Sequence, residues 1–136
     1  MSRYKTGRGF TLVELLIAIA VVSVLIGVAV PSYRQHVIRG KRSAAQAAMM
    51  DIANRQQQFL LANRRYADKE TLEGNGFSLP SEVSANYVWD IDLGSDARPS
   101  FVITFTGTGT QAADNTPAPL TLDSSGEKAP AEKWQR

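Results

Sequence analysis

The stretch GRGFTLVELL, residues 7–16, decides how this chain is organised. It opens an apolar run from Phe10 to Val30 in which Glu14 is the one charged side chain. A helix of that length extends about 31 Å, which matches the hydrocarbon thickness of a bilayer, so the run is predicted to span a membrane. A carboxylate well inside such a helix costs about 2.5–3.5 kcal/mol on insertion, and less near an end. Glu14 is therefore predicted to have a functional partner.

Three basic residues and no acid precede the apolar run: Arg3, Lys5 and Arg8. This asymmetry predicts that the short N-terminal stub stays on the cytoplasmic side. A secretory signal would carry a small-residue cleavage site after its apolar core. Here Pro31-Ser32-Tyr33-Arg34 leads directly into more helix-forming sequence, so the apolar segment is predicted to be retained.

The basic leader ending in Gly9, the stretch from Phe10 to Glu14, and the Pro31 that ends the apolar run resemble the N-terminus of the type IV pilin family. The resemblance implies cleavage after Gly9 by a prepilin peptidase and N-methylation of Phe10. It also implies that Glu14 meets the Phe10 amine of a neighbouring subunit, and that the helix extends around Pro31 in a filament. The alternative is a signal-anchored periplasmic protein in which Glu14 has no role.

Composition limits what else the chain can be. Of its 136 residues, about 75 remain for a globular part beyond a long helix, which is enough for one small core. Removing the leader's three bases leaves 12 Lys and Arg against 13 Asp and Glu, so there is no global basic signature for nucleic acid. Cysteine is absent. The disulfide that closes the C-terminal loop of most pilins is therefore excluded.

We expect one helix from about Phe10 to Asn63. Residues 1–9 would be a cleaved leader, residues 10–31 the transmembrane and assembly half, and residues 32–136 a periplasmic domain whose helical spine covers 32–63. Past Pro31 the pattern becomes amphipathic. Its apolar positions are Tyr33, Val37, Ala44, Ala45, Ala48, Met49, Ile52, Phe59 and Leu60.

A connecting loop is predicted over residues 64–85, anchored by Tyr66, Leu72, Phe77 and Leu79. Residues 86–93 and 100–107 alternate as half-buried strands, with Trp89, Leu93 and Phe105 among the inward positions. A polar loop over 108–119, a short strand at 120–123 and an edge segment ending at Trp134 complete a sheet region at 86–136. The predicted fold class is α+β: one long helix packed on a small antiparallel meander.

No catalytic constellation is found. The single histidine, His36, has no cysteine to act with, and Gly107-Thr108-Gly109 lacks the context of a phosphate loop. Asp114, Asp123 and Glu127 are the one group considered as a calcium site, by likeness to secretion pseudopilins. They lack a regular ligand spacing. We therefore expect no enzyme activity, no cofactor and no metal.

A basic cluster follows the membrane segment: Arg34, Arg39, Lys41 and Arg42. It can contact anionic headgroups before assembly, pair with neighbouring subunits, or bind DNA, and the first two are favoured by its place beside the lipid. Arg55, Arg64 and Arg65 form a smaller patch, interpreted as a solvated face. The strand aromatics are interpreted as core rather than a nucleic-acid stacking surface.

The resemblance implies a structural subunit of a type IV pilus, most similar to the minor pilins of type IVa pili, with adhesion, twitching motility and DNA uptake as roles of the whole system. A major pilin, a type II secretion pseudopilin and a DNA-binding competence pilin remain as alternatives. The implied partners are other pilins, the prepilin peptidase and the inner-membrane assembly platform. The implied location is the bacterial inner membrane, with a periplasmic C-terminal domain, and then the pilus.

Overall fold

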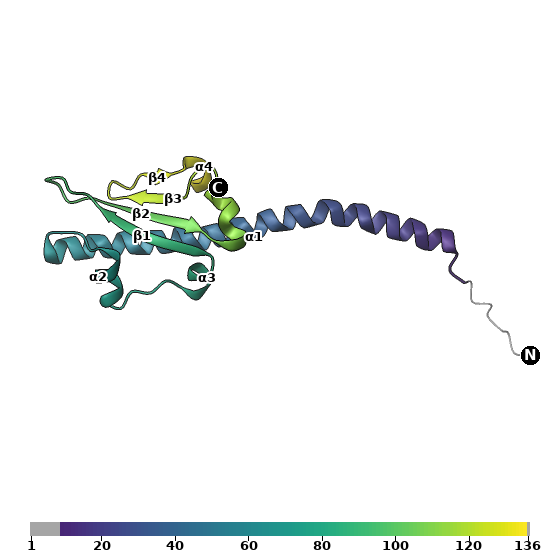
Figure 1. The fold of residues 1–136 in the computed structure, drawn as a ribbon, viewed down its shortest axis with the longest axis horizontal. Helices are drawn as coiled ribbons and strands as arrows, with labels where there is room; N and C mark the ends of the chain where they lie inside the picture. The colour runs from purple at the N-terminus through teal and green to yellow at the C-terminus, as the bar shows by residue number, and fades with distance from the viewer. Residues whose placement is uncertain (1–8, 136) are drawn as a thin grey trace, which may run out of the picture. The chain divides into compact units, whose positions relative to one another are not determined.

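The computed structural model describes residues 9–135, so the basic leader residues Arg3, Lys5 and Arg8 lie outside the described part. The elements are α1 (Leu12–Asn63), α2 (Lys69–Gly74), α3 (Ser81–Ser84), β1 (Tyr87–Leu93), β2 (Phe101–Gly107), the 3₁₀ helix η1 (Gly109–Asn115), β3 (Leu120–Asp123), β4 (Lys128–Ala129) and α4 (Ala131–Trp134). A long helix followed by one antiparallel sheet confirms the predicted α+β class (Figure 1). The chain forms two compact units that divide between Val37 and Ile38.

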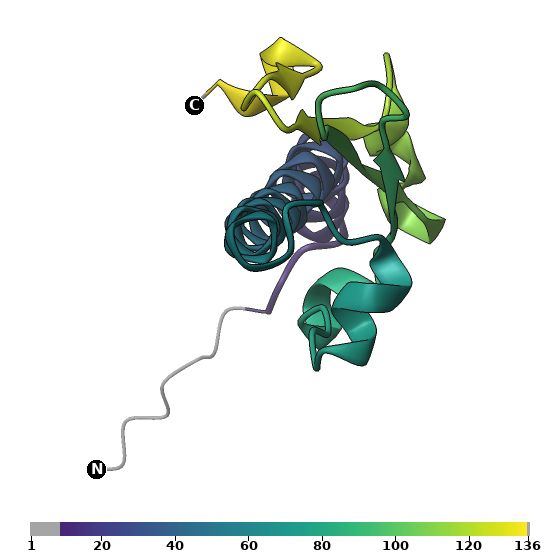
Figure 2. The same cartoon turned by 90° about the vertical axis from the view of Figure 1, so that its left-hand side faces the viewer.

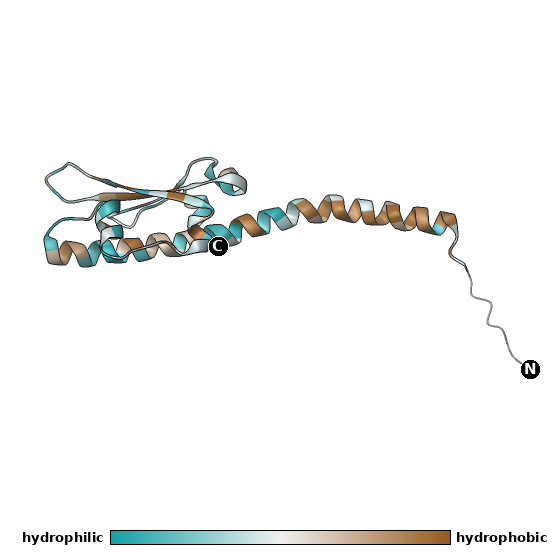
Figure 3. Cartoon of the chain, turned by 60° about the horizontal axis from the view of Figure 1, so that its bottom comes forward, coloured by the Kyte–Doolittle hydropathy of each residue, from teal (hydrophilic) through white to brown (hydrophobic). Residues whose placement is uncertain are grey.

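The first unit contains the apolar half of α1. Its side chains are exposed around the whole circumference. Figure 3 shows that most of this half is apolar. By length and composition, α1 is the one helix of the described residues that could cross a membrane. Pro31 lies inside α1 without ending it. The expected single helix is therefore confirmed, with its start at Leu12.

The second unit is built on a four-stranded sheet in the order β1-β2-β3-β4, with all neighbours antiparallel. Trp89 is opposite Phe105 and Ile91 is opposite Ile103, so the inward side chains of β1 and β2 form one apolar face. Alternate residues of both strands are buried, as the two-residue periodicity predicts. Leu122 continues this face onto β3, opposite Ile103.

The second half of α1 packs on this apolar face, and Figure 2 shows the helix end-on beside the sheet. Ala45, Met49 and Ile52 are fully buried, which confirms the predicted stripe over this part of the helix. Tyr66 packs edge-on against Phe101 with the ring centroids 4.7 Å apart. The core therefore lies between α1, the sheet and the connection that follows α1.

The connection from α1 to β1 is held by a buried amide. Gln56 of α1 is fully buried, accepts a hydrogen bond from the Ala67 amide at 2.8 Å and donates one to the Ala67 carbonyl at 2.5 Å. The predicted anchors Tyr66, Leu72 and Phe77 are buried, and α2 and α3 form within what was expected to be a loop. Satisfying both backbone groups of one residue fixes where the chain leaves α1.

Four local predictions are wrong. Tyr33 is 70% exposed because it precedes the part of α1 that meets the sheet, and Leu93 is 43% exposed because it ends an edge strand. The predicted loop after β2 contains η1. The predicted edge segment is present as β4 but ends at Ala129, and Trp134 ends the helix α4. Gly107 lets η1 fold back, since a Cβ there would lie 2.3 Å from the Gln111 carbonyl oxygen.

Candidate functional site

The start of α1 carries the predicted processing and assembly residues. Gly9 and Phe10 are exposed, and Phe10 precedes the helix by two positions. The Thr11 hydroxyl accepts a hydrogen bond from the Glu14 amide at 3.2 Å and lies 3.4 Å from the Glu14 carboxylate, to which it donates. Thr11 is therefore the N-cap of α1, with Glu14 in the third helical position, where a carboxylate also complements the helix dipole.

This cap gives Glu14 a partner within its own chain. The contact is long and exposed, so the carboxylate stays accessible to another cation. Pairing of Glu14 with the amine of a neighbouring subunit stays a prediction. The cap also explains why Thr follows Phe10, since a hydroxyl at this position satisfies an otherwise unpaired amide of the first turn.

The four residues of the basic cluster have different environments. Arg34 and Arg39 are exposed, whereas Lys41 and Arg42 are half-buried. Lys41 donates to the Asn86 side chain at 2.7 Å, beside the start of β1. Arg42 donates through Nε to Asp114 Oδ1 at 2.7 Å and forms an ion pair with the same carboxylate. Two of the four cations are thus engaged within the domain, whereas Arg34 and Arg39 are exposed and form no ion pair among residues 9–135.

Asp114 lies at the centre of a buried polar cluster. Its carboxylate accepts from Arg42 and from the Tyr87 hydroxyl at 2.7 Å. Gln111, also on η1, donates to Tyr87 at 2.7 Å and to the Ile38 carbonyl of α1 at 3.0 Å. Burial, followed by the hydrogen bond to Asp114, raises the pKa of Tyr87 well above its ordinary value. The cluster ties η1 to α1 at the first residue of the second unit.

Lys133 joins the C-terminal helix to the same cluster. Its ammonium donates to the carbonyl oxygens of Asp114 and Ala118, while its own carbonyl accepts from Gln46 of α1 at 2.9 Å. Burial lowers the pKa of Lys133, and the nearby Asp114 carboxylate partly offsets that effect. These contacts fasten the C-terminal segment to α1 without a disulfide.

The remaining sequence candidates stay separate. Asp114 pairs with Arg42, whereas Asp123 accepts from Ser125 and from the amide of Glu127 in the β3–β4 turn. Among residues 9–135, no three potential His, Cys, Asp or Glu ligands meet at one point. His36 is exposed on α1, and the predicted strand aromatics Tyr87, Trp89, Phe101 and Phe105 are all buried core residues.

Sequence reasoning missed the polar residues that organise the second unit. Gln56 could have been found, because it occupies the apolar stripe at the helical spacing of Met49 and Ile52. Gln111 and Asp114 carry no such signal, because they lie in a polar stretch whose conversion into η1 depends on tertiary contacts.

Two family profiles match the chain. One is described as a prokaryotic N-terminal methylation motif and covers residues 5–30. The other is described as the type IV minor pilin ComP, DNA uptake sequence receptor, and covers residues 31–121, which is most of the chain. The second match includes β1, β2 and η1, ends within β3 and leaves out β4 and the C-terminal helix α4.

Curated relatives are pilins. The type IV major pilin PilE1 of Neisseria gonorrhoeae is 30% identical over 86 residues, covering 63% of this chain and 52% of the relative. PilA of Myxococcus xanthus is 34% identical over 61 residues, covering 45% and 28%. A fimbrial protein of Neisseria meningitidis is 30% identical over 63% of this chain and 49% of its own length. The aligned part thus spans about half of the Neisseria relatives and less of PilA. No solved structure matches the chain.

Proposed function

This chain belongs to the family of the type IV minor pilin ComP, DNA uptake sequence receptor, and from that membership we propose that it is a minor pilin, a structural subunit of a type IV pilus rather than an enzyme. The observation that carries the proposal is the apolar half of α1, which is exposed on every side and holds one carboxylate near its start. Lipid can cover this surface before assembly, and equivalent helices can cover it afterwards.

The proposed maturation begins with cleavage after Gly9 by a prepilin peptidase and methylation of Phe10. The protein is then anchored in the inner membrane with residues 32–136 in the periplasm, and the assembly platform transfers it to the pilus. The match of residues 5–30 to a methylation motif supports this order. Mass spectrometry of the protein from its native host should find a chain that begins at methylated Phe10, and an intact Met1 would refute the processing step.

We propose that Glu14 exchanges its Thr11 contact for the Phe10 amine of a neighbouring pilin during assembly. The present contact is a neutral hydroxyl at 3.4 Å, which is weaker than an ion pair formed in a medium of low dielectric constant. A separated carboxylate and amine are costly in hydrocarbon, so their pairing favours one axial offset between subunits. Arg34 and Arg39, whose side chains are exposed, are proposed to contact headgroups or neighbouring subunits.

The test replaces Glu14 by Val and by Gln, with Ser23→Ala as a control in the same apolar segment. Each variant is expressed beside the other pilins of the host, and the inner-membrane and sheared-pilus fractions are compared by immunoblot. Both Glu14 variants should accumulate in the membrane and be depleted from pili, while Ser23→Ala should behave as wild type. Wild-type incorporation of both Glu14 variants would refute the proposed contact.

A second function, binding of DNA during its uptake, is favoured by the printed description of the family, which names a DNA uptake sequence receptor. After removal of the leader the chain has no excess of basic residues. A DNA contact would therefore depend on a local group of cations rather than on the net charge of the protein.

A further inference from the structure

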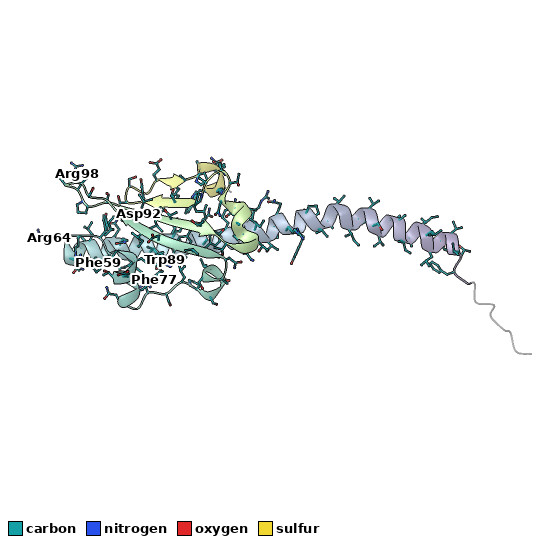
Figure 4. All side chains as sticks on the ribbon, viewed as in Figure 1. Phe59, Arg64, Phe77, Trp89, Asp92 and Arg98 are labelled. Atoms are coloured by element: carbon teal, nitrogen blue, oxygen red, sulfur yellow. The ribbon has the colours of Figure 1, made fainter. Side chains whose placement is uncertain are left out.

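Three arginines gather at one end of the second unit, where α1 ends and β1 turns into β2. Arg64 and Arg65 follow the last residue of α1, and Arg98 lies in the β1–β2 turn. Figure 4 shows Arg64 and Arg98 at the same end of the sheet. A groove separates the two segments, lined by Arg65 and Tyr66 on one side and by Leu93, Asp96, Pro99 and Ser100 on the other. All three arginines are exposed.

The backbone of Arg64 is in the left-handed region, with φ of 59°. Its amide donates to the Leu60 carbonyl at 2.8 Å, which closes the C-terminal turn of α1. Glycine is the residue that adopts this conformation without steric cost, and asparagine is the next most tolerant. Arg64 is the one non-glycine residue with positive φ within the described residues. A bulky residue at a strained helix end motivates the search for a use of its side chain.

The guanidinium groups of Arg64 and Arg98 form no ion pair within residues 9–135. Arg65 lies near Asp68, whose pKa is lowered first by hydrogen bonding to Thr71 and to a smaller extent by the charge of Arg65. Asp96 lines the groove. Asp92, which is exposed near the end of β1, is a third carboxylate in this region. The end is therefore not strongly positive overall, but Arg64 and Arg98 have no carboxylate partner among residues 9–135 and can bind a ligand.

We propose that Arg64, Arg65 and Arg98 form a contact site for the phosphodiester backbone of duplex DNA. The proposal rests on the DNA-binding function proposed above and names the residues that perform it. A guanidinium presents paired N–H donors that match the geometry of a phosphate, and phosphate contacts fix the position of a protein on DNA without reading its sequence. Three contacts predict a slope of about −2.7 for the logarithm of the association constant against that of salt concentration.

The competing role for Arg64 and Arg65 is compensation of the negative end of the α1 dipole. The two roles differ in one measurable respect. Dipole compensation predicts that replacing Arg64 by Gly lowers the melting temperature. DNA contact predicts weaker binding with a melting temperature that is unchanged or raised, because glycine removes the backbone strain.

The test uses the purified full-length protein in detergent micelles and a fluorescently labelled 20-base-pair duplex, with binding measured by anisotropy between 50 and 200 mM salt. The variants are Arg64→Gly and Arg98→Gln, and Lys128→Gln removes the same charge from β4 as a control. Each arginine variant should bind about three- to tenfold more weakly and reduce the salt slope by about 1, whereas Lys128→Gln should bind as wild type. A second duplex of unrelated sequence should give the same changes, because phosphates are being contacted.

Failure of the site and failure of the DNA function give different results. Wild-type protein that does not bind either duplex would overturn both. Wild-type binding that is reduced equally by Lys128→Gln, or by none of the three variants, would leave the DNA function and overturn this site. A lower melting temperature for Arg64→Gly, combined with unchanged binding by Arg98→Gln, would assign the arginines to the helix end instead.

Discussion

The two halves of α1 belong to one continuous helix but are stabilised by different surroundings. Before Val37 the helix is exposed, and its apolar run ends at Val30. Among the described residues of this part, one side-chain hydrogen bond reaches an acid, from Thr11 to Glu14. From Ile38 onward the helix is amphipathic and is held by the sheet, by Gln111 and by the Arg42–Asp114 ion pair. The first half depends on lipid or other helices, and the second half depends on its own domain.

This difference predicts which substitutions damage the domain and which damage only assembly. Side chains that contact the sheet or η1 should control the free energy of unfolding of the second unit. Side chains before Val37 should control insertion and incorporation into pili, with little effect on the stability of the domain. The following substitutions test that division in order of decreasing expected effect.

The largest effect is expected for Phe105→Ala. Phe105 is fully buried on β2, opposite Trp89 and within 6.3 Å of its ring centroid. Truncating a buried phenylalanine costs about 3–5 kcal/mol, which is a large share of the stability of a small domain. Urea denaturation followed by tryptophan fluorescence should give an unfolded or strongly destabilised protein. A wild-type midpoint would mean that the strand facing described here is wrong.

The second largest effect is expected for Asp114→Ala, which should lower the free energy of unfolding by about 2–3 kcal/mol. It leaves the half-buried Arg42 without its carboxylate and the Tyr87 hydroxyl without its acceptor. Arg42→Met and the double variant complete a double-mutant cycle by urea denaturation, and a coupling energy near zero would show that the ion pair does not hold η1 on α1. Asp114→Asn keeps the shape of the side chain and one acceptor oxygen, so it should lower the free energy of unfolding by less than Asp114→Ala.

The strand facing on which the Phe105 prediction depends was available from the sequence. Tyr87, Trp89, Phe101 and Phe105 recur at even spacing within their two strands, and a two-residue period assigns them to one face without knowledge of the rest of the fold. The apolar half of α1 was predicted equally well, because membrane thickness and helical rise fix its length. Both cases depend on a local rule that one segment satisfies alone.

The Arg42–Asp114 contact could not be predicted from a local sequence pattern. Its two residues are 72 positions apart, and Arg42 was expected to face lipid or a neighbouring subunit. Burial of two opposite charges depends on where η1 folds back over β2, which requires Gly107 and the tertiary contacts of Gln111. Neither charge is distinguishable in the sequence from a solvated surface residue.

Tyr87 provides a smaller and pH-dependent effect. Its pKa is raised in the folded state, so the neutral phenol is favoured by folding and its contribution is fully present below the unfolded value of about 10. Above pH 10 the unfolded chain loses this proton first, and stability should fall by up to about 1.4 kcal/mol per pH unit. The free energies of unfolding of wild type and Tyr87→Phe, measured by urea denaturation between pH 8 and 11, should therefore converge as the pH rises.

Lys133 changes the stability of the domain in the opposite direction over the same pH range. Burial lowers its pKa, so folding favours its neutral form and its contribution rises as pH increases towards the unfolded value. Lys133 is present in both proteins, so the difference between wild type and Tyr87→Phe isolates the phenol. A constant difference across the range would contradict the assignment of a buried Tyr87 proton.

The smallest effect is expected for Leu16→Ala, in the exposed half of α1, compared with Ile52→Ala, in the buried half. Leu16 lies in the first unit and is 58% exposed, whereas Ile52 is fully buried in the core of the second unit. In detergent-solubilised full-length protein, Leu16→Ala should change the free energy of domain unfolding by less than about 0.5 kcal/mol, whereas Ile52→Ala should cost about 2–5 kcal/mol. Urea denaturation followed by the fluorescence of buried Trp89 reports on the domain in both cases. If Leu16→Ala destabilised the domain as much as Ile52→Ala, the two halves of α1 would be energetically coupled, and the change of environment at Ile38 would not mark the limit of the folded unit.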